Sequence, residues 1–422
     1  MDKASEKKFL IPEFGPLAGV RVISAGSIVA MPHAANMLAD FGAEVIHIER
    51  PDSGDTFRGL GPFAEYNGKK VSTSWAQDAR NRLSMGLNLN LVVPEVKELF
   101  LELIKVTDIF MENLVWLDKY GVSDEMLLEV NPKLVIVHVS GFGRPQFGGL
   151  PEVCDRASYD MIGQAASGLM FLNGDQDRPP VVAKPWLNDY QAALTTVFGA
   201  LIGYIHAQKT GKGQSVDVAQ FEAAARLLAD TFVSYTEADI IRKRTQASIA
   251  DAFQPYGVFK DKSGNYVVIG AFGPGVYNRF IKAVGFDLEY FNFKDCASSP
   301  KAVASEKGQE LHRKTVEWVA DRTADVVVEV ISKAKVGCSK VYSAVDAVSD
   351  PHWLDRGDII EYEDQTLNKK IKAFGIVPKL SDSPGKVWRG APTLGQDTEE
   401  ILGTLLGYSA EKIKGLKQKG LI

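Results

Sequence analysis

Short apolar runs alternate with helix-length amphipathic segments along the first 220 residues, and this alternation limits the fold more than any other feature. We predict strands at residues 21–24, 44–49, 109–112 and 134–140, and helices at residues 30–41, 94–105 and 124–130. Strands that alternate with helices of this length form βαβ units with right-handed crossovers. The pattern therefore predicts an α/β fold whose large, Rossmann-like domain is built on a mostly parallel sheet.

The pattern changes in the second half of the chain. A long helix at 190–208 is followed by glycines at 211 and 213, and residues 235–335 then suggest a hairpin around 260–264 with helices behind it. We therefore expect a first part of the large, ligand-binding domain at 1–225 and a smaller α+β domain at 226–340. Strand and helix patterns return in the tail, so 341–422 is expected to be a return segment that completes the large domain.

Composition and charge argue against nucleic-acid and membrane partners. The 422 residues are 45% hydrophobic and 24% charged, which is typical of a globular protein. Lys and Arg total 48 against 53 Asp and Glu, so the net charge of −5 predicts no nucleic-acid partner. No apolar run reaches the roughly 18 uncharged residues of a spanning helix, and the charged N-terminus has no apolar stretch behind it. We expect no membrane contact and a cytoplasmic location, where three scattered cysteines would stay reduced.

Several common site motifs are missing from the sequence. The first βα turn, Ser24-Ala-Gly-Ser-Ile-Val-Ala30, has one glycine where a dinucleotide fingerprint needs three. The six histidines have no partner at metal-ligand spacing, so no metal is predicted. His47 and His138 lie within predicted strands, which favours structural roles for both.

Asp189 is the residue that position singles out. It ends the extended segment Val182-Ala-Lys-Pro-Trp-Leu-Asn-Asp189 and comes just before the predicted long helix. A carboxylate there can cap the helix, and a nucleophilic carboxylate profits from the same loop-to-helix position. Position alone does not separate the two roles.

A basic cluster follows the second strand, with two open interpretations. It could hold a phosphorylated ligand near the carboxyl ends of the strands, or it could be a solvated surface. The cluster comprises Arg50, Arg58, Lys69, Lys70, Arg80 and Arg82.

Six segments in order resemble the class III CoA-transferases, the family of formyl-CoA transferase, and most closely its carnitine/crotonobetaine and bile-acid branches. The match runs nearly end to end. The segments are Phe14-Gly-Pro-Leu-Ala-Gly-Val-Arg-Val22, Phe41-Gly-Ala-Glu-Val-Ile-His-Ile-Glu-Arg50, Asn131-Pro-Lys-Leu-Val-Ile-Val-His-Val-Ser-Gly-Phe-Gly143, Arg156-Ala-Ser-Tyr-Asp-Met-Ile-Gly-Gln-Ala-Ala-Ser-Gly168, Gly211-Lys-Gly-Gln-Ser-Val-Asp-Val-Ala219 and Trp388-Arg-Gly-Ala-Pro392.

The resemblance implies a function and a catalytic residue. It places the family's catalytic aspartate on Asp189, which would attack an acyl-CoA thioester to give a mixed anhydride and then an aspartyl-CoA thioester. CoA enters as substrate and no other cofactor is implied, since a carboxylate is expected to be ionised near pH 7. The free acid is implied to be carnitine-like or bile-acid-like, although the residues do not rank these against aromatic or hydroxy acids.

The resemblance also implies a CoA site and an assembly. Family members of this kind are homodimers of two interlocked rings, so we expect an interlocked homodimer here. The acceptor pocket is expected to involve the small domain and the loop at 253–258. The implied CoA contacts are Ser27, Ile28, Val29, Ala30, Arg50, Leu87, Asn113 and Lys119.

Departures from the family pattern bear on the alternatives. Ser140 stands where formyl-CoA transferase has a lysine, and Gly270-Ala-Phe-Gly-Pro-Gly275 only partly matches its glycine loop, which disfavours an oxalate/formate pair. The α-methylacyl-CoA racemases share the fold but carry a histidine in the segment where Tyr159 stands here, and tyrosine, with a pKa of about 10, is a poor base at neutral pH. A third alternative, an inactive scaffold subunit of a hetero-oligomer, is disfavoured by the presence of Asp189.

Overall fold

The computed structural model describes residues 7–114, 117–244 and 253–422. The chain folds into two compact units. Unit 1 comprises the described parts of residues 1–169, 183–229 and 352–422, and unit 2 comprises those of 170–182 and 230–351. The sequence places the boundaries at 225/226 and 340/341, and it assigns 170–182 to the large domain, whereas these residues belong to unit 2.

The six-stranded sheet at the centre of unit 1 confirms the predicted α/β fold. Its order is β5-β2-β1-β6-β7-β8, and every neighbouring pair is parallel. All the strands except the edge strand β8 are almost continuously buried because helices cover both faces, as is usual for parallel sheets. The strands are β1 (Arg21–Ala25), β2 (Glu44–Glu49), β5 (Arg82–Gly86), β6 (Ile109–Glu112), β7 (Val135–Ser140) and β8 (Gln214–Ala219).

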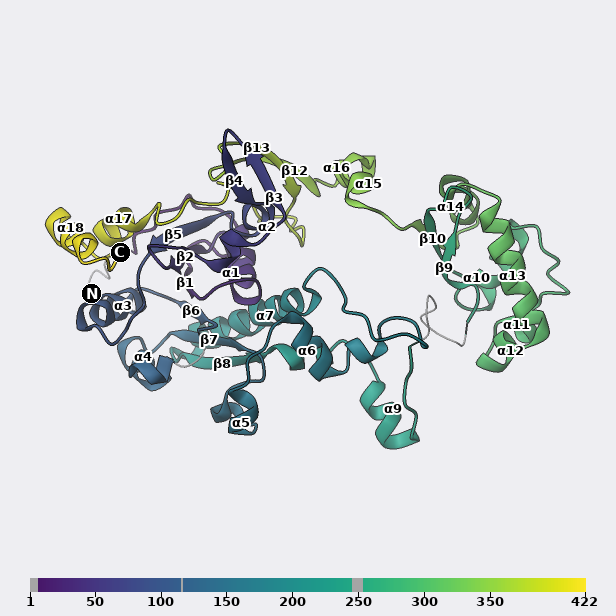
Figure 1. Ribbon diagram of the computed structural model, residues 1–422, viewed down its shortest axis with the longest axis horizontal. Helices are drawn as coiled ribbons and strands as arrows, with labels where there is room; N and C mark the ends of the chain where they lie inside the picture. Colours follow the sequence, from purple (N-terminus) through teal and green to yellow (C-terminus); the bar gives the residue numbers. More distant parts are fainter. Residues whose placement is uncertain (1–6, 115–116, 245–252) are drawn as a thin grey trace. The chain divides into compact units, whose positions relative to one another are not determined.

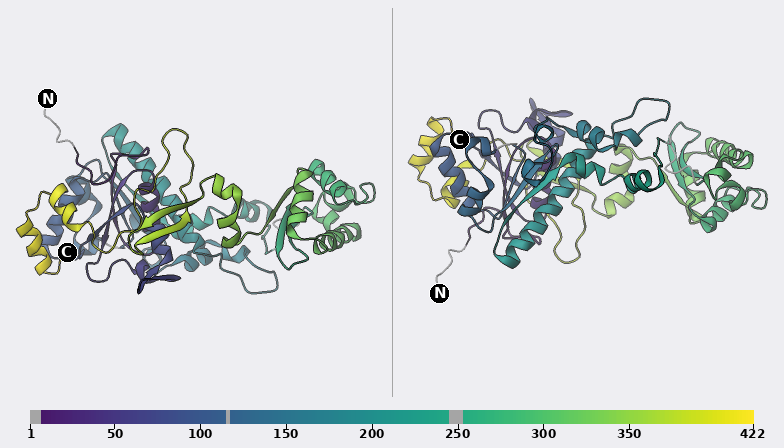
Figure 2. Two further views of the ribbon diagram at one scale, coloured as in Figure 1. Left: turned by 90° about the horizontal axis from the view of Figure 1, so that it is seen from above. Right: turned by 90° about the horizontal axis from the view of Figure 1, so that it is seen from below.

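Two helix layers enclose this sheet (Figures 1 and 2). Side chains from α1 (Ala30–Asp40) and the 24-residue α7 (Leu187–Thr210) pack with Val22 and its strand neighbours on one face. On the other face Ile23 and its neighbours pack with α3 (Pro94–Lys105) and α4 (Asp124–Val130). Adjacent residues of β1 thus enter different cores, as the two-residue period of a strand requires.

The C-terminal segment completes unit 1. The hydroxyl of Tyr408 donates to Glu102 of α3 at 2.6 Å, and the backbone N–H of Gly86 in β5 donates to Thr398 Oγ1 at 2.9 Å. In both views of Figure 2 the yellow C-terminal helices lie beside blue α3. The elements of this segment are the hairpin strands β12 (Ile359–Asp364) and β13 (Lys369–Phe374), α17 (Thr398–Glu400), the π-helical turn η5 (Ile401–Leu405) and α18 (Ala410–Gln418).

The strand order reverses at the centre of the sheet. The chain runs from β1 through α1 to β2 on one side, and β6 later pairs with the opposite side of β1. The loops that leave β1 and β6 therefore diverge at the carboxyl edge of the sheet. Such a switch point is where open α/β sheets place their ligands.

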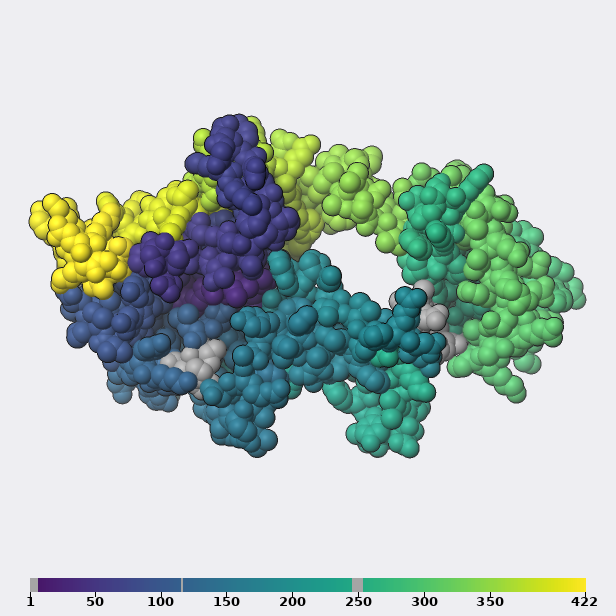
Figure 3. Space-filling view, viewed as in Figure 1, coloured from purple at the N-terminus to yellow at the C-terminus, as the bar shows by residue number. Residues whose placement is uncertain are grey.

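The basic cluster divides between the interior and the surface of unit 1. Arg80 is buried against Asp40, with 2.6 Å between its guanidinium and the carboxylate, and Arg82 is 1% exposed. These two arginines therefore belong neither to a phosphate-binding site nor to a solvated surface. They are buried in the interior of unit 1. Lys69 and Lys70 are exposed on the hairpin of β3 (Phe63–Tyr66) and β4 (Lys69–Ser72), which projects from unit 1 (Figure 3).

The remaining helices of unit 1 are short. The chain leaves the helical path soon after residue 225, and Ala229 has a φ of 50°. None of the described helices combines the length and apolarity needed to cross a membrane. The short helices of unit 1 are α2 (Thr73–Asp78), α5 (Pro151–Cys154), α6 (Asp160–Ser167) and α8 (Gln220–Ala225).

Unit 2 is an α+β unit with its own core, as the sequence predicts. Its antiparallel sheet has the order β11-β10-β9, and apolar side chains such as Val267 and Ile269 pack against the helices. The rings of Phe253 and Phe272 meet edge to face at 4.8 Å, which joins the 253–258 and 270–275 loops. The elements are α9 (Thr231–Ala238), β9 (Tyr256–Lys260), β10 (Tyr266–Gly270), α10 (Pro274–Ala283), α11 (Phe293–Cys296), α12 (Pro300–Ala304), α13 (Glu306–Ala320), α14 (Ala324–Lys333), β11 (Gly337–Lys340) and α15 (Ala344–Ser349), followed by α16 (Pro351–Asp355) at the boundary with unit 1.

Candidate active site

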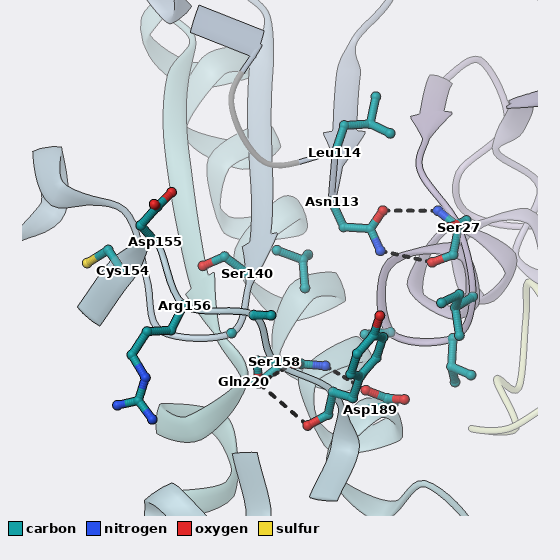
Figure 4. Close-up of a pocket in the computed structure, with 17 residues that line it drawn as sticks. Ser27, Asn113, Leu114, Ser140, Cys154, Asp155, Arg156, Ser158, Asp189 and Gln220 are labelled. Atoms are coloured by element: carbon teal, nitrogen blue, oxygen red, sulfur yellow. Dashed lines mark hydrogen bonds between the residues drawn. The ribbon is translucent and has the colours of Figure 1, made fainter. Parts of the chain in front are cut away.

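A cavity of about 380 Å³ opens at the switch point of the sheet in unit 1 (Figure 4). The loops after β1 and β6 contribute Ser27 and Asn113 to its wall, and Ser140 at the end of β7 adds to it. Asp189, at the start of α7, and Gln220, directly after β8, line it as well. The parallel strands thus bring residues from distant parts of the sequence to one polar cavity.

Asp189 is not the cap of its helix. It is the third residue of α7, and the capping position is Trp186, which has a φ of 45° and makes no side-chain capping bond. Asp160 of α6 accepts the free backbone N–H groups instead, from Asn188 at 2.8 Å and from Asp189 at 3.3 Å. The capping alternative is therefore wrong, and the carboxylate of Asp189 does not serve the helix backbone.

The carboxylate of Asp189 is held at one oxygen. Its residue is 7% exposed, and Oδ1 accepts a hydrogen bond from Gln220 Nε2 at 2.5 Å. The hydroxyl of Ser158 in turn donates to Gln220 Oε1 at 3.3 Å, and Figure 4 shows both bonds as dashed lines. Among the described residues, no hydrogen bond to Oδ2 accompanies the one to Oδ1, which leaves Oδ2 for a reactant.

The environment of Asp189 raises the pKa of its carboxyl group to about 7. Burial is the largest cause, because it disfavours the charged form, and the nearby negative charge of Asp160 adds to it. The hydrogen bond from Gln220 lowers the pKa but does not offset these effects. Asp189 is therefore harder to ionise near pH 7 than the ordinary carboxylate that the sequence led us to expect.

Four of the expected CoA contacts form the loop from β1 to α1. Ser27, Ile28, Val29 and Ala30 all line the cavity. Asn113 fixes the loop, since its Oδ1 accepts from the Ser27 N–H at 3.0 Å and its Nδ2 donates to the Ser27 carbonyl at 2.9 Å. The backbone is strained there, because Ile28 has a φ of 72°.

The other expected CoA contacts do not line this cavity. Arg50 is exposed and pairs with Asp52 at 3.1 Å, whereas Leu87 is buried in the core beyond β5. The Lys119 side chain is 64% exposed, and its ammonium lies 4.0 Å from Asp155, a residue of the cavity wall. Residues 115–116, in the loop between Asn113 and Lys119, lie outside the described residues.

Tyr159 lies on the same cavity as Asp189. It precedes the first turn of α6 and is 66% exposed. The tyrosine that bears on the racemase alternative is therefore an exposed residue of the cavity wall.

His138 has the structural role predicted for it. Its imidazole lies between Glu112, at 2.5 Å, and Asp124, at 3.0 Å. Burial lowers the pKa of His138, but hydrogen bonds to the two carboxylates outweigh burial, so the pKa is raised. His47 is likewise hydrogen-bonded in the core, to Ser24 and Asp55. In the described ranges no group of three or more His, Cys, Asp or Glu is arranged to hold a metal.

Three polar residues of the site were not predicted. Ser158 and Asp160 lie within a segment that carried the family resemblance, but nothing in that segment indicated contact with Asp189. Gln220 is 31 residues from Asp189 and has no motif of its own. The available signal was its position just after a parallel strand, at the edge where ligands bind.

Comparisons with known proteins identify the family of this chain. The model of the CoA-transferase family III matches residues 17–398. The chain is 36% identical to the bile acid CoA-transferase BaiK of Clostridium scindens over 97% of this chain and 90% of that protein. It is 33% identical to the L-carnitine CoA-transferase of Proteus mirabilis over 97% of each.

Solved structures show the same fold. A CAIB/BAIF family protein from Brucella suis superimposes with a TM-score of 0.79 at 26% identity, over 93% of this chain and all of that one. Rv3272 from M. tuberculosis gives a TM-score of 0.76 at 20% identity, over 92% and 99% of the two chains, which is a likeness of fold alone. With the family model spanning most of its length, this chain belongs to the CoA-transferase family III.

Proposed function

We propose that this enzyme moves CoA from an acyl-CoA thioester to a free carboxylic acid through covalent intermediates on Asp189. One observation carries the proposal: a buried carboxylate, Asp189, lines the switch-point cavity, and among the described residues its only side-chain hydrogen bond is the one from Gln220 to Oδ1. A raised pKa means that the ionised form is poorly stabilised by its surroundings, which makes it a stronger nucleophile than an exposed carboxylate.

The reaction divides into four attacks. The ionised Asp189 attacks the thioester carbonyl and expels the CoA thiolate, which leaves a mixed anhydride. The thiolate attacks the Asp189 carboxyl carbon and releases the donor acid, giving an aspartyl-CoA thioester. The acceptor acid then attacks that carbon and the thiolate attacks the new anhydride, so the product acyl-CoA leaves and Asp189 is restored.

We place part of the CoA site on the loop from β1 to α1. Ser27, Ile28, Val29 and Ala30 line the cavity beside Asn113, and α1 begins without a side-chain cap, so its first N–H groups suit an anionic ligand. Contacts from Arg50, Leu87 and Lys119 to CoA stay predictions. No cofactor besides the CoA thioester is part of the proposal, and a cytoplasmic location also stays a prediction.

The choice of acceptor acid follows from the relatives. The relatives named above act on a bile acid and on L-carnitine, and both are large acids compared with formate. We propose an acceptor of one of these two kinds. A panel of acyl-CoA donors crossed with free acids, including bile acids, carnitine, hydroxy acids and oxalate, should give CoA transfer to one of the first two. Transfer to oxalate alone would contradict this choice.

A racemase activity is the alternative, and Tyr159 makes it testable. Moving an α-proton needs an acid and a base on opposite sides of the carbon, and tyrosine is a poor base at neutral pH. In deuterated water with a 2-methylacyl-CoA, we expect no deuterium at the α-carbon by mass spectrometry over many turnovers of transfer. Exchange as fast as transfer would favour the racemase.

We also propose the homodimer that the family resemblance implies. Four exposed apolar residues are spaced four, four and three residues apart, which places them on one face of α7: Leu194, Phe198, Ile202 and Ile205. An apolar stripe of this length is typical of a surface that another chain covers.

Two interlocked rings would have no route to monomers short of unfolding, so dilution should not separate them. Light scattering and sedimentation are expected to give about twice 46.1 kDa down to nanomolar protein. A monomer that forms reversibly on dilution would contradict the interlocked arrangement.

A further inference from the structure

Gln220 is placed to act on the same carboxyl group that the proposed function makes covalent. It is 8% exposed, lines the cavity and donates from Nε2 to Asp189 Oδ1 at 2.5 Å. Its position directly after β8 keeps its backbone on the edge of the rigid sheet. A donor that is fixed before the reaction begins can stabilise charge without rearranging.

Ser158 holds the oxygen end of the Gln220 amide. An ionised carboxylate only accepts, so it faces the donating Nε2, and the Ser158 hydroxyl donates to Oε1 at the other end of the amide. Ser158 packs directly against Gly141. A larger residue at 141 would displace Ser158, because a Cβ atom there would lie only 2.1 Å from the Cβ of Ser158. Asp189, Ser158 and Gly141, which come from separate parts of the chain, thus together fix the position of the Gln220 amide.

We propose that Gln220 is a catalytic residue: its Nε2 donates to Asp189 Oδ1 while that atom is the oxyanion of the tetrahedral intermediates formed at the Asp189 carboxyl carbon. This inference rests on the proposed function and assigns the donor for its two middle steps. The first and last attacks take place at a substrate carbonyl and do not use this donor.

Each of the two middle steps forms one bond to the Asp189 carboxyl carbon and breaks another. The CoA thiolate forms a bond to the carboxyl carbon of the anhydride, and the pair of electrons of the C=Oδ1 bond moves onto Oδ1. Collapse restores C=Oδ1 and expels the donor acid as a carboxylate that carries the bridging oxygen. In the next step a carboxylate oxygen of the acceptor adds to the same carbon, Oδ1 again takes the charge, and the CoA thiolate leaves. Oδ1 stays on Asp189 throughout, beside Gln220 Nε2.

Gln220→Met is the first test, because it keeps the side-chain length and removes the donor. Removal of one oxyanion donor typically costs about 100-fold or more in kcat. Well above the pKa of Asp189, we expect a loss of about that size in kcat with KM for the acyl-CoA little changed. Rapid quenching and mass spectrometry should show the aspartyl-CoA adduct forming slower by the same factor.

The matched control is Gln191→Met, which changes a half-buried glutamine near the start of α7 that does not line the cavity. Its kcat is expected to stay within about threefold of the wild type, as for substitutions away from a site. An unchanged rate of adduct formation in Gln220→Met would overturn the inference. If Asp189→Asn is inactive at the same time, the proposed function survives that failure.

Gln220→Glu separates a catalytic role from a structural one, because only a catalytic role predicts that the variant has a different pH profile of activity. The glutamate can donate to Oδ1 only while it is protonated, and two adjacent carboxyl groups share one proton over a limited range of pH. Wild-type kcat/KM should rise as Asp189 of the free enzyme ionises around pH 7 and then level off. The variant should instead lose activity again as the pH rises further, and a variant profile of wild-type shape would overturn the inference.

Discussion

Asp189→Asn is expected to lose CoA transfer by at least about four orders of magnitude, because the nucleophile takes part in every covalent step. An asparagine can still accept the hydrogen bond from Gln220 at Oδ1, so the site should keep its shape. The measurement is kcat with saturating acyl-CoA and acceptor acid, accompanied by a circular dichroism spectrum to confirm folding.

Glu222→Gln is the control for loss of a nearby carboxylate, since Glu222 is exposed on α8 two residues from Gln220 and does not line the cavity. It should keep transfer within about threefold of the wild type. Full transfer by Asp189→Asn would remove Asp189 from the mechanism, and Asp189→Ala should behave as the asparagine variant does.

The same asparagine variant should be more stable than the wild type, by an amount that depends on pH. The folded-state pKa of Asp189 is raised from 3.8 to about 7, so folding favours its protonated form. Wild type and variant should therefore be equally stable below about pH 4, where the aspartate is protonated in both the folded and the unfolded state. As the pH rises, the wild type loses stability until the folded carboxyl group ionises.

Above about pH 7 the difference should be constant and on the order of 4 kcal/mol in the free energy of unfolding, from a shift of about three pKa units. Denaturant or thermal unfolding of both proteins at several pH values measures it. A stabilisation that is the same at acid and alkaline pH, or a loss of stability, would show that Asp189 is not held in a costly ionised state. Active-site groups often lower the stability of the folded protein in this way, because the arrangement that favours activity is not the most stable one.

Much of the large domain could be predicted because its elements are long and regularly patterned. Helix α3 begins and ends at the predicted residues, Pro94 and Lys105, since a proline in the first turn and an apolar face mark it clearly. The bounds of α4 and β6 were also as predicted. These elements carry their own signals and need no knowledge of their neighbours.

Strand β5 was missed for a tertiary reason. It contains a buried arginine, Arg82, and a buried serine, Ser84, so it lacks the apolar run of its neighbours. The hydroxyl of Ser84 donates to Glu49 at 2.6 Å, and its backbone N–H donates to Asp397 at 2.8 Å. Partners this distant in sequence make a polar strand stable in the interior and leave no local pattern to recognise.

Some residues of the candidate site could be predicted from the sequence, and others could be found only from the tertiary structure. Asp189 and the loop at 27–30 were found through motifs, and the structure brings both to one cavity. The capping role of Asp160 and the contact of Gln220 with Asp189 are tertiary. Sequence alone could not separate a cap from a nucleophile at Asp189, because the answer depends on whether another residue caps the helix.

Trapping the covalent intermediate tests the central claim most directly. The enzyme is mixed with an acyl-CoA in the absence of acceptor, treated with hydroxylamine, digested and sequenced by mass spectrometry. We predict a hydroxamate on Asp189 and on no other carboxyl group, formed only when acyl-CoA is present. Transfer that proceeds with no modification of Asp189, or with the modification on a different residue, would contradict the account.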